Sequence, residues 1–135
     1  ELGVGFVAYS PLGRGALTGK LDRGALVGGG DFRGSLPRFS ERNFDANMER
    51  TRGLFALAEK KGVMPAQAAL AWLLSKGDDV VAIPGARRLD HLSENVQAAA
   101  LELSPEEIAE LDAAFAPGAI RGERYTQEGM AGVNA

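Results

Sequence analysis

Glycine, hydroxyl and basic residues follow a short apolar run near the start of the sequence, in the string YSPLGRGALTGK, which begins at Tyr9. An aromatic ring at the end of a strand offers a flat face to another ring, and Ser10 offers a hydroxyl. Gly13 and Gly15 allow backbone N–H groups to turn toward an anion, and Arg14 and Lys20 add positive charge nearby. The pattern indicates an anion site, although a tight strand-to-loop turn with incidental charges also explains it.

A second polar string, IPGARRLDHLSEN, begins at Ile83 after another apolar run and opens a predicted helix. The free N–H groups and the positive dipole end of a helix N-terminus bind phosphate, and Arg87 and Arg88 would add donors. Acidic side chains are usually favoured at that position, so the two arginines favour an external anion. A solvated, charged first turn is the alternative. Glu94 and Asn95 lie one or two turns along, where they could hydrogen-bond an adenine or ribose edge.

Composition and charge exclude several classes of function. The formal net charge of −3 over 135 residues argues against nucleic acid as the main partner, because phosphate binding needs a basic surface. The sequence has no cysteine, which excludes disulfides and thiolate metal sites and is compatible with a reducing cytoplasm. No apolar run approaches the roughly 18 residues that span a bilayer, and no signal peptide is visible. We therefore expect a cytoplasmic protein that binds neither nucleic acid nor a membrane.

Two short apolar runs, near residues 5–8 and 80–83, are predicted to be buried parallel strands, each with one motif at its C-terminal end. Residues 12–45, after the first strand, show no clear period, and the glycines at 28–30 break any helix or strand. This length exceeds the usual loop limit of about 12–15 residues, so the stretch is predicted to be functional or disordered. Its phenylalanines can dock, which favours a lid that orders on a ligand.

Helical spacing of apolar residues predicts helices over residues 48–61 and from 65 to about 77, the second of them largely buried. A third helix is predicted from about Leu89, with Leu92 and Val96 on its inner face.

A fourth helix is predicted after Ser104, which is its cap, while Glu107 completes a capping box. Its buried face is predicted to consist of Ile108, Leu111 and Phe115. Residues 121–135 are polar and glycine-rich and are predicted to be a tail or a surface loop.

The order of strand, long loop, two helices, strand, two helices and tail indicates a parallel α/β fold. Two strands cannot close such a sheet, because each side would keep an exposed edge, which natural proteins avoid. We therefore expect further strands from outside this chain. The sequence begins at Glu1 and runs at once into an apolar segment, as expected for an internal piece of a longer protein.

The strings FVAYSPLGRGALTGK and IPGARRLDHLSENVQAAALELSPEEIAELD resemble the seventh-strand and eighth-strand segments of the NADPH-dependent aldo-keto reductases, and their spacing agrees. The resemblance covers nearly the whole chain. It implies that residues 1–135 are the C-terminal, NADP-binding portion of a (β/α)8 TIM barrel, strands 7 and 8 with their helices. NADPH would lie across the C-terminal face of the barrel, where the loops after strands 7 and 8 commonly hold phosphate.

The resemblance also implies a role for each motif residue. Tyr9 resembles the aromatic residue that stacks on the nicotinamide, the segment 10–15 resembles the turn around the pyrophosphate, and Lys20 would reach a phosphate. Arg33 or Arg38 is expected to reach the pyrophosphate when the lid closes. The implied cofactor-binding residues are Tyr9, Ser10, Pro11, Leu12, Gly13, Gly15, Lys20, Gly85, Arg87, His91, Glu94 and Asn95.

In the second motif, Gly85 and Arg87 resemble the residues at the adenosine 2′-phosphate, and Glu94 and Asn95 resemble the adenine contacts. His91 departs from the pattern, because the family often has arginine or glutamine there. A histidine's charge at neutral pH depends on its surroundings, so His91 is predicted either to touch the cofactor or to be a solvated surface residue.

Nothing in the sequence matches the catalytic Asp, Tyr, Lys and His of the family, so no catalytic residue is assigned. The resemblance implies an oxidoreductase that reduces aldehydes or ketones to alcohols, seen here as a partial chain whose partners are a small carbonyl substrate and the missing N-terminal half of the barrel. Two alternatives are a nucleotide-binding regulatory subunit, such as a potassium-channel β subunit, and a non-catalytic truncated homologue. Arg124, Tyr125 and Met130 could line a substrate site, unless the tail only packs on the barrel surface.

Overall fold

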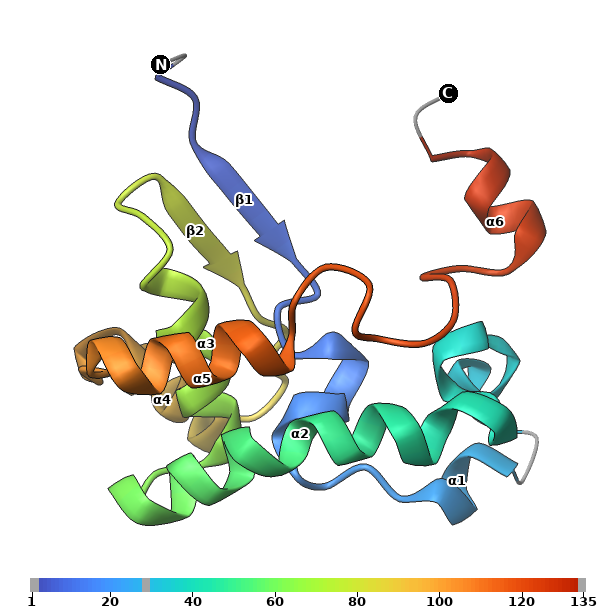
Figure 1. Ribbon diagram of the computed structural model, residues 1–135, viewed down its shortest axis with the longest axis horizontal. Helices are drawn as coiled ribbons and strands as arrows, with labels where there is room; N and C mark the ends of the chain where they lie inside the picture. Colours follow the sequence, from blue (N-terminus) through green and yellow to red (C-terminus); the bar gives the residue numbers. More distant parts are fainter. Residues whose placement is uncertain (1–2, 28–29, 134–135) are drawn as a thin grey trace.

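The structure is a computed structural model that describes residues 3–27 and 30–133. The described residues contain two strands, β1 (Phe6–Tyr9) and β2 (Val80–Ile83), which pair in parallel with their last residues opposite each other. Figure 1 shows the two strands side by side and pointing the same way. The predicted strands and their orientation are confirmed, so both motifs leave the sheet at the same end.

The sheet exposes large apolar side chains. The exposed fractions are 61% for Phe6, 58% for Val7, 54% for Val81 and 52% for Ile83. Valine, isoleucine and phenylalanine favour strands because they pack on a pleated surface, and here much of that surface is uncovered. The observation agrees with the expectation that further strands are needed.

The long helix α2 (Glu41–Lys61) begins seven positions before the predicted start at residue 48, which corrects the predicted boundary. Its first turns are held by contacts with the preceding segment: Phe44 is buried, and Asn43 donates a hydrogen bond to the Pro37 carbonyl oxygen. The helix ends where predicted, at Gly62, which adopts a left-handed conformation with φ of 66°.

The stretch between β1 and α2 is more regular than predicted. It contains helix α1 (Arg23–Val27) and short 3-10 helices at Gly13–Thr18, Phe32–Ser35 and Pro37–Phe39. A small core holds these pieces together, made of Leu26, Leu36, Phe39 and Phe44. The expectation that phenylalanines dock this stretch is confirmed for two of them, whereas Phe32 is exposed. Gly28 and Gly29 lie outside the described residues, and ordering of the stretch by a ligand stays a prediction.

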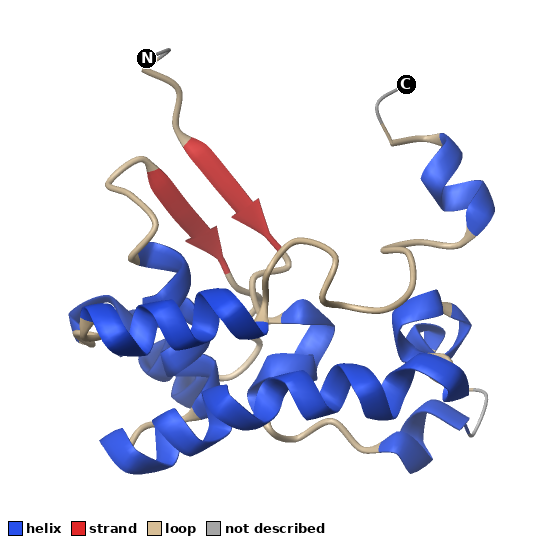
Figure 2. Ribbon diagram, viewed as in Figure 1, coloured by secondary structure: helices blue, strands red, loops and turns tan. Residues whose placement is uncertain are grey.

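Helix α3 (Pro65–Leu74) forms the centre of the main core. Residues 67–71 are all buried, which confirms the prediction that this helix is largely buried. It packs against α2 and β2, and its core side chains join those of α2 and of α5 (Pro105–Ala114). The shared cluster consists of Leu54, Leu57, Ala58, Ala68, Ala69 and Leu111. In Figure 2 the helices α2, α3 and α5 lie next to one another, below the two strands.

Helix α4 (Leu89–Gln97) has the predicted position but not the predicted inner face. Leu92 is 50% exposed and Val96 is 66% exposed, so the prediction that they face inward is wrong for this chain. The physical reason is that α4 packs on α3 with its other side, and no element of the described residues covers its apolar stripe.

Helix α5 has the predicted cap: the Ser104 hydroxyl accepts the Glu107 N–H, and the Glu107 carboxylate accepts the Ser104 N–H at 2.9 Å. Leu111 is buried, whereas Ile108 and Phe115 are only half-buried. The tail, predicted to be a loop, contains a short helix, α6 (Gln127–Ala131), which corrects that prediction. Thr126 starts it by accepting the Gly129 N–H. Within the described residues, no helix is both long and apolar enough to cross a membrane.

The Lys61 ammonium holds the pKa of the Glu107 carboxyl below its ordinary value, and the Ser104 N–H adds to this effect. Because the folded pKa is lower, the ionised carboxylate stabilises the fold above the unfolded pKa of about 4.3, and this contribution is lost as pH falls through the folded pKa. Glu107→Gln is expected to lower the free energy of unfolding at neutral pH. Between about pH 5 and 3 the variant should lose less of this free energy than the wild type does.

Urea unfolding at a series of pH values measures this effect. Glu110→Gln is the matched control, because Glu110 lies on the same helix and forms no ion pair within the described residues. Equal pH profiles for the two variants would contradict the role given to Glu107.

Candidate functional site

The first motif forms a tight turn directly after β1. Ser10 and Arg14 adopt positive φ angles of 51° and 56°, and the two glycines around Arg14 do the same. The Gly13 N–H donates to the Ser10 carbonyl oxygen and the Gly15 N–H donates to the Leu12 carbonyl oxygen. Both glycine N–H groups are therefore occupied inside the turn, and any anion here must be met by other donors.

Gly15 has a second structural reason to lack a side chain. A Cβ there would lie 2.9 Å from Nη1 of Arg33, which donates to the Arg14 carbonyl oxygen at 2.8 Å. Arg33 also pairs with Asp31 at 2.5 Å. Arg33 therefore holds the turn in place through these two contacts. Of the two arginines predicted to reach the pyrophosphate, Arg38 is the one that forms no ion pair within the described residues.

A cavity of about 370 Å³ opens beside the end of β1. Tyr9, Ser10, Pro11 and Gly13 line it, so the structure brings these predicted residues to one hollow. Leu12 instead packs against the main core, and Lys20 is exposed. Most of the remaining wall is apolar and comes from the helices and from the segment after α5, including Phe39, Phe44, Met48, Trp72, Phe115 and Ile120.

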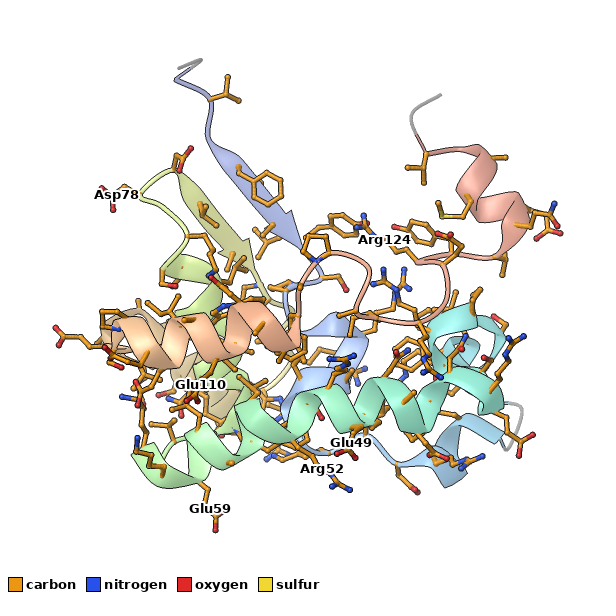
Figure 3. The ribbon with its side chains drawn as sticks, in the orientation of Figure 1. Glu49, Arg52, Glu59, Asp78, Glu110 and Arg124 are labelled. Carbon is orange, nitrogen blue, oxygen red and sulfur yellow. The ribbon has the colours of Figure 1, made fainter. Side chains whose placement is uncertain are left out.

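The Tyr9 hydroxyl connects the cavity to the tail. Its oxygen accepts hydrogen bonds from Arg124 at 2.6 Å and from the Tyr125 hydroxyl at 3.1 Å. The Tyr125 hydrogen bond, followed by those from Arg124, lowers the pKa of Tyr9, and the same contact raises the pKa of Tyr125. The residue as a whole is 49% exposed. Figure 3 shows Arg124 on the tail segment near the end of β1.

The tail crosses the cavity and is held by side chains from distant segments. Asn47 accepts the Arg121 N–H at 2.7 Å and donates to its carbonyl oxygen at 2.9 Å. Arg38 donates to the Gly122 carbonyl oxygen at 3.3 Å, and Arg14 donates to that of Arg124 at 2.8 Å. Of the three tail residues that could line a substrate site, Arg124 lines the cavity, whereas Tyr125 and Met130 do not. Sequence reasoning missed Asn47, because no motif marks it.

The second motif lies at the same end of the sheet but outside this cavity. Gly85 and Arg87 are exposed, and within the described residues Arg87 forms no ion pair. Arg88 pairs with Asp90 at 2.6 Å, so the paired acid satisfies the preference for negative charge in the first turn of α4. His91, Glu94 and Asn95 are half-buried along the same helix. The arrangement leaves Arg87 as the available cation at this helix start.

Comparison with known proteins shows which family this chain belongs to. The family model described as the aldo/keto reductase family matches residues 1–116, which is most of the chain. The chain belongs to the aldo/keto reductase family. A curated relative, the aldo-keto reductase str7 of Strobilurus tenacellus, is 40% identical over 129 residues, which are 96% of this chain and 38% of the relative. Members of the family are oxidoreductases that generally use nicotinamide cofactors.

A solved structure is also similar, that of the thermostable aldo-keto reductase Tm1743 in complex with the inhibitor epalrestat. The match has a TM-score of 0.57 and 37% identity and covers 83% of this chain and 30% of the solved chain. The chain therefore spans well under half the length of both relatives. The two parallel strands with their helices are compatible with part of the barrel of this family.

Proposed function

We propose that this chain is the C-terminal, NADP-binding part of a reductase that transfers hydride from NADPH to the carbonyl of an aldehyde or ketone. The observation that carries the proposal is the placement of both motifs at the same end of two parallel strands. In barrels of this kind the ligand lies at the C-terminal ends of the strands. By resemblance, β1 and β2 would be strands 7 and 8.

The residues fit a nicotinamide dinucleotide at two separate points. Tyr9 is half-exposed beside the cavity and its ring offers a stacking surface, and Arg87 offers an available cation at a helix start. NADPH supplies a hydride when it is bound. Tyr9 would orient the nicotinamide ring, while the pyrophosphate would be held by Ser10, Pro11, Leu12, Gly13, Gly15 and Lys20.

At the other end of the cofactor, Gly85 and Arg87 would hold the 2′-phosphate, and His91, Glu94 and Asn95 would contact the adenosine. Because the N–H groups of Gly13 and Gly15 are occupied, side chains must supply most of the positive charge at the phosphates. Arg38 and Arg124 are the cationic side chains that line the cavity outside the turn, and Arg38 would meet the pyrophosphate.

The remaining strands and the groups that polarise and protonate the carbonyl are proposed to come from the rest of the protein. The exposed apolar faces of β1 and β2 and the apolar stripe of α4 would be covered by it. The lack of cysteine favours a reducing compartment, and we propose the cytoplasm.

The test is to read the gene upstream of Glu1 and to weigh the natural protein by mass spectrometry. The complete protein is then mixed with NADPH and a panel of aldehydes, and loss of NADPH absorbance is followed. We expect aldehyde-dependent oxidation by the complete protein and none by the chain alone. Cofactor binding without turnover would favour a regulatory subunit, and a natural protein of 135 residues would favour a truncated homologue.

A further inference from the structure

Three arginine side chains line the cavity: Arg14 after β1, Arg38 before α2, and Arg124 in the tail. Within residues 3–27 and 30–133 none of them forms an ion pair, although other basic residues, such as Arg23, do so on the surface. Each donates to one neutral oxygen: Arg14 to the Arg124 carbonyl, Arg38 to the Gly122 carbonyl, and Arg124 to the Tyr9 hydroxyl. A guanidinium has more donors than this, so spare N–H groups remain on all three.

This concentration of positive charge is unfavourable for the protein alone. Burial and the positive charges of Arg124 and Arg14 lower the pKa of Arg38, and Glu123 offsets this only in part. Like charges in a partly desolvated site repel one another, so an anion that entered it would be attracted by all three. The whole chain carries a net charge of −3, so the cluster runs against its overall balance.

The position of Arg124 indicates which part of a ligand would meet this charge. Its guanidinium lies 5.5 Å from the centre of the Tyr9 ring and is bonded to the hydroxyl of that ring. Under the proposed function, Tyr9 faces the nicotinamide, where the carbonyl reacts. A group that meets Arg124 would therefore lie at the nicotinamide end of the site, away from Arg87 and the adenosine.

The rest of the cavity wall is mainly aromatic and aliphatic. It suits an apolar body with one charged end. Arg14 also stands over the Tyr125 ring, 4.9 Å from its centre, which fixes the guanidinium next to Arg124. The two cations are thus held in place before a ligand arrives.

We propose that Arg124, supported by Arg14, binds a carboxylate on the carbonyl substrate, so that the enzyme prefers apolar aldehydes or ketones that carry an acid group. This inference rests on the proposed function. It makes the tail a determinant of substrate choice and gives a ligand to Arg124 and Arg14, while Arg38 would still meet the cofactor's phosphates.

The test compares 4-carboxybenzaldehyde with its methyl ester in the complete protein with NADPH. The two aldehydes differ in the charge of one group. The wild-type kcat/KM should favour the acid, and Arg124→Gln should reduce the acid-to-ester ratio of kcat/KM about 10- to 100-fold, the loss expected for one charge-assisted hydrogen bond. Calorimetric binding of 4-carboxybenzyl alcohol should weaken by a similar factor, and this readout does not depend on turnover. Arg14→Gln should reduce both quantities to a smaller extent.

The matched control is Arg121→Gln, which removes the same charge from the same tail. Its described contacts are through the backbone, to Asn47. An equal loss in this control would mean that only the general charge of the tail matters, and would overturn the proposal.

Two further outcomes would also overturn it. A rise in the NADPH dissociation constant of Arg124→Gln, with an unchanged acid-to-ester ratio, would assign the cluster to the cofactor's phosphates. A wild-type enzyme that reduces both aldehydes equally would reject the carboxylate site while leaving the reductase activity intact. Failure to reduce either aldehyde would reject the proposed function, and the binding of the alcohol would still decide whether a carboxylate is recognised.

Discussion

Replacing Leu54 by alanine is expected to destabilise the protein by about 2–5 kcal/mol, the range for large-to-small changes at fully buried sites. Leu54 has an exposed fraction of 0% and lies where α2 meets α3 and α5. Deleting its methyl groups would leave a cavity in the cluster with Ala68, Ala69 and Leu111, and these small or already packed neighbours cannot fill it. Urea unfolding of the variant and the wild type measures the loss.

Leu89→Ala is the matched control, because it deletes the same atoms from a side chain that is 85% exposed. Its effect is expected to stay within about 0.5 kcal/mol. Similar losses for the two variants would mean that the three helices are not the main source of stability. If the rest of the protein covers the start of α4, Leu89→Ala will cost more in the complete protein than in this chain alone.

The parts of the fold that were predicted correctly are those with local causes. The two strands follow from short apolar runs that are ended by Pro11 and Pro84. The start of α5 follows from Ser104 and Glu107, which satisfy each other's backbone N–H groups within one turn. Neither feature depends on residues that are distant in the sequence, so the pattern was sufficient.

The face of α4 shows the limit of periodicity. The spacing of Leu92 and Val96 predicts correctly that one stripe of the helix is apolar, but it carries no information about what covers that stripe. In the described residues nothing does. The prediction of an inner face therefore assumed a neighbour that this chain does not supply.

The tail and the stretch before α2 were predicted poorly because contacts between distant segments hold them in place. The side chain of Asn47 bonds the backbone of Arg121, 74 positions away, and Arg38 bonds Gly122, 84 positions away. Gly122 fits there with φ of 87° because a Cβ would lie 2.8 Å from the Pro37 carbonyl oxygen. Neither the glycine nor the asparagine stands out in the sequence, and their roles appear only when the segments are brought together.

The candidate site was predicted in outline and corrected in detail. The glycines of the first motif were expected to offer N–H groups to an anion, yet the turn uses both. At the helix start of the second motif the sequence favours Arg87 over Arg88 as the phosphate ligand, and in the structure Arg88 forms an ion pair with Asp90. In both places the residue types indicate positive potential, while the geometry decides which donors remain available.

That difference between neighbouring arginines leads to a prediction about cofactor choice. Arg87→Ala is expected to weaken NADPH binding by the complete protein about 10- to 100-fold and to leave NADH binding nearly unchanged. The reason is that NADPH differs from NADH by the 2′-phosphate, and a charge-assisted hydrogen bond to it is lost with the guanidinium. Within the described residues Arg87 is exposed and has no carboxylate partner, so it can meet a phosphate without first breaking an ion pair.

Arg88→Ala is the control, since it removes the same charge one position along the chain. Arg88 already donates to Asp90 through Nε and Nη2, and the variant is expected to change the NADPH dissociation constant by less than about threefold. Fluorescence titration of both cofactors against the wild type and the two variants gives six dissociation constants to compare. Equal losses of affinity for NADPH and NADH in Arg87→Ala would show that Arg87 does not bind the 2′-phosphate. A larger loss in Arg88→Ala would show instead that the phosphate displaces Asp90 and recruits the paired arginine.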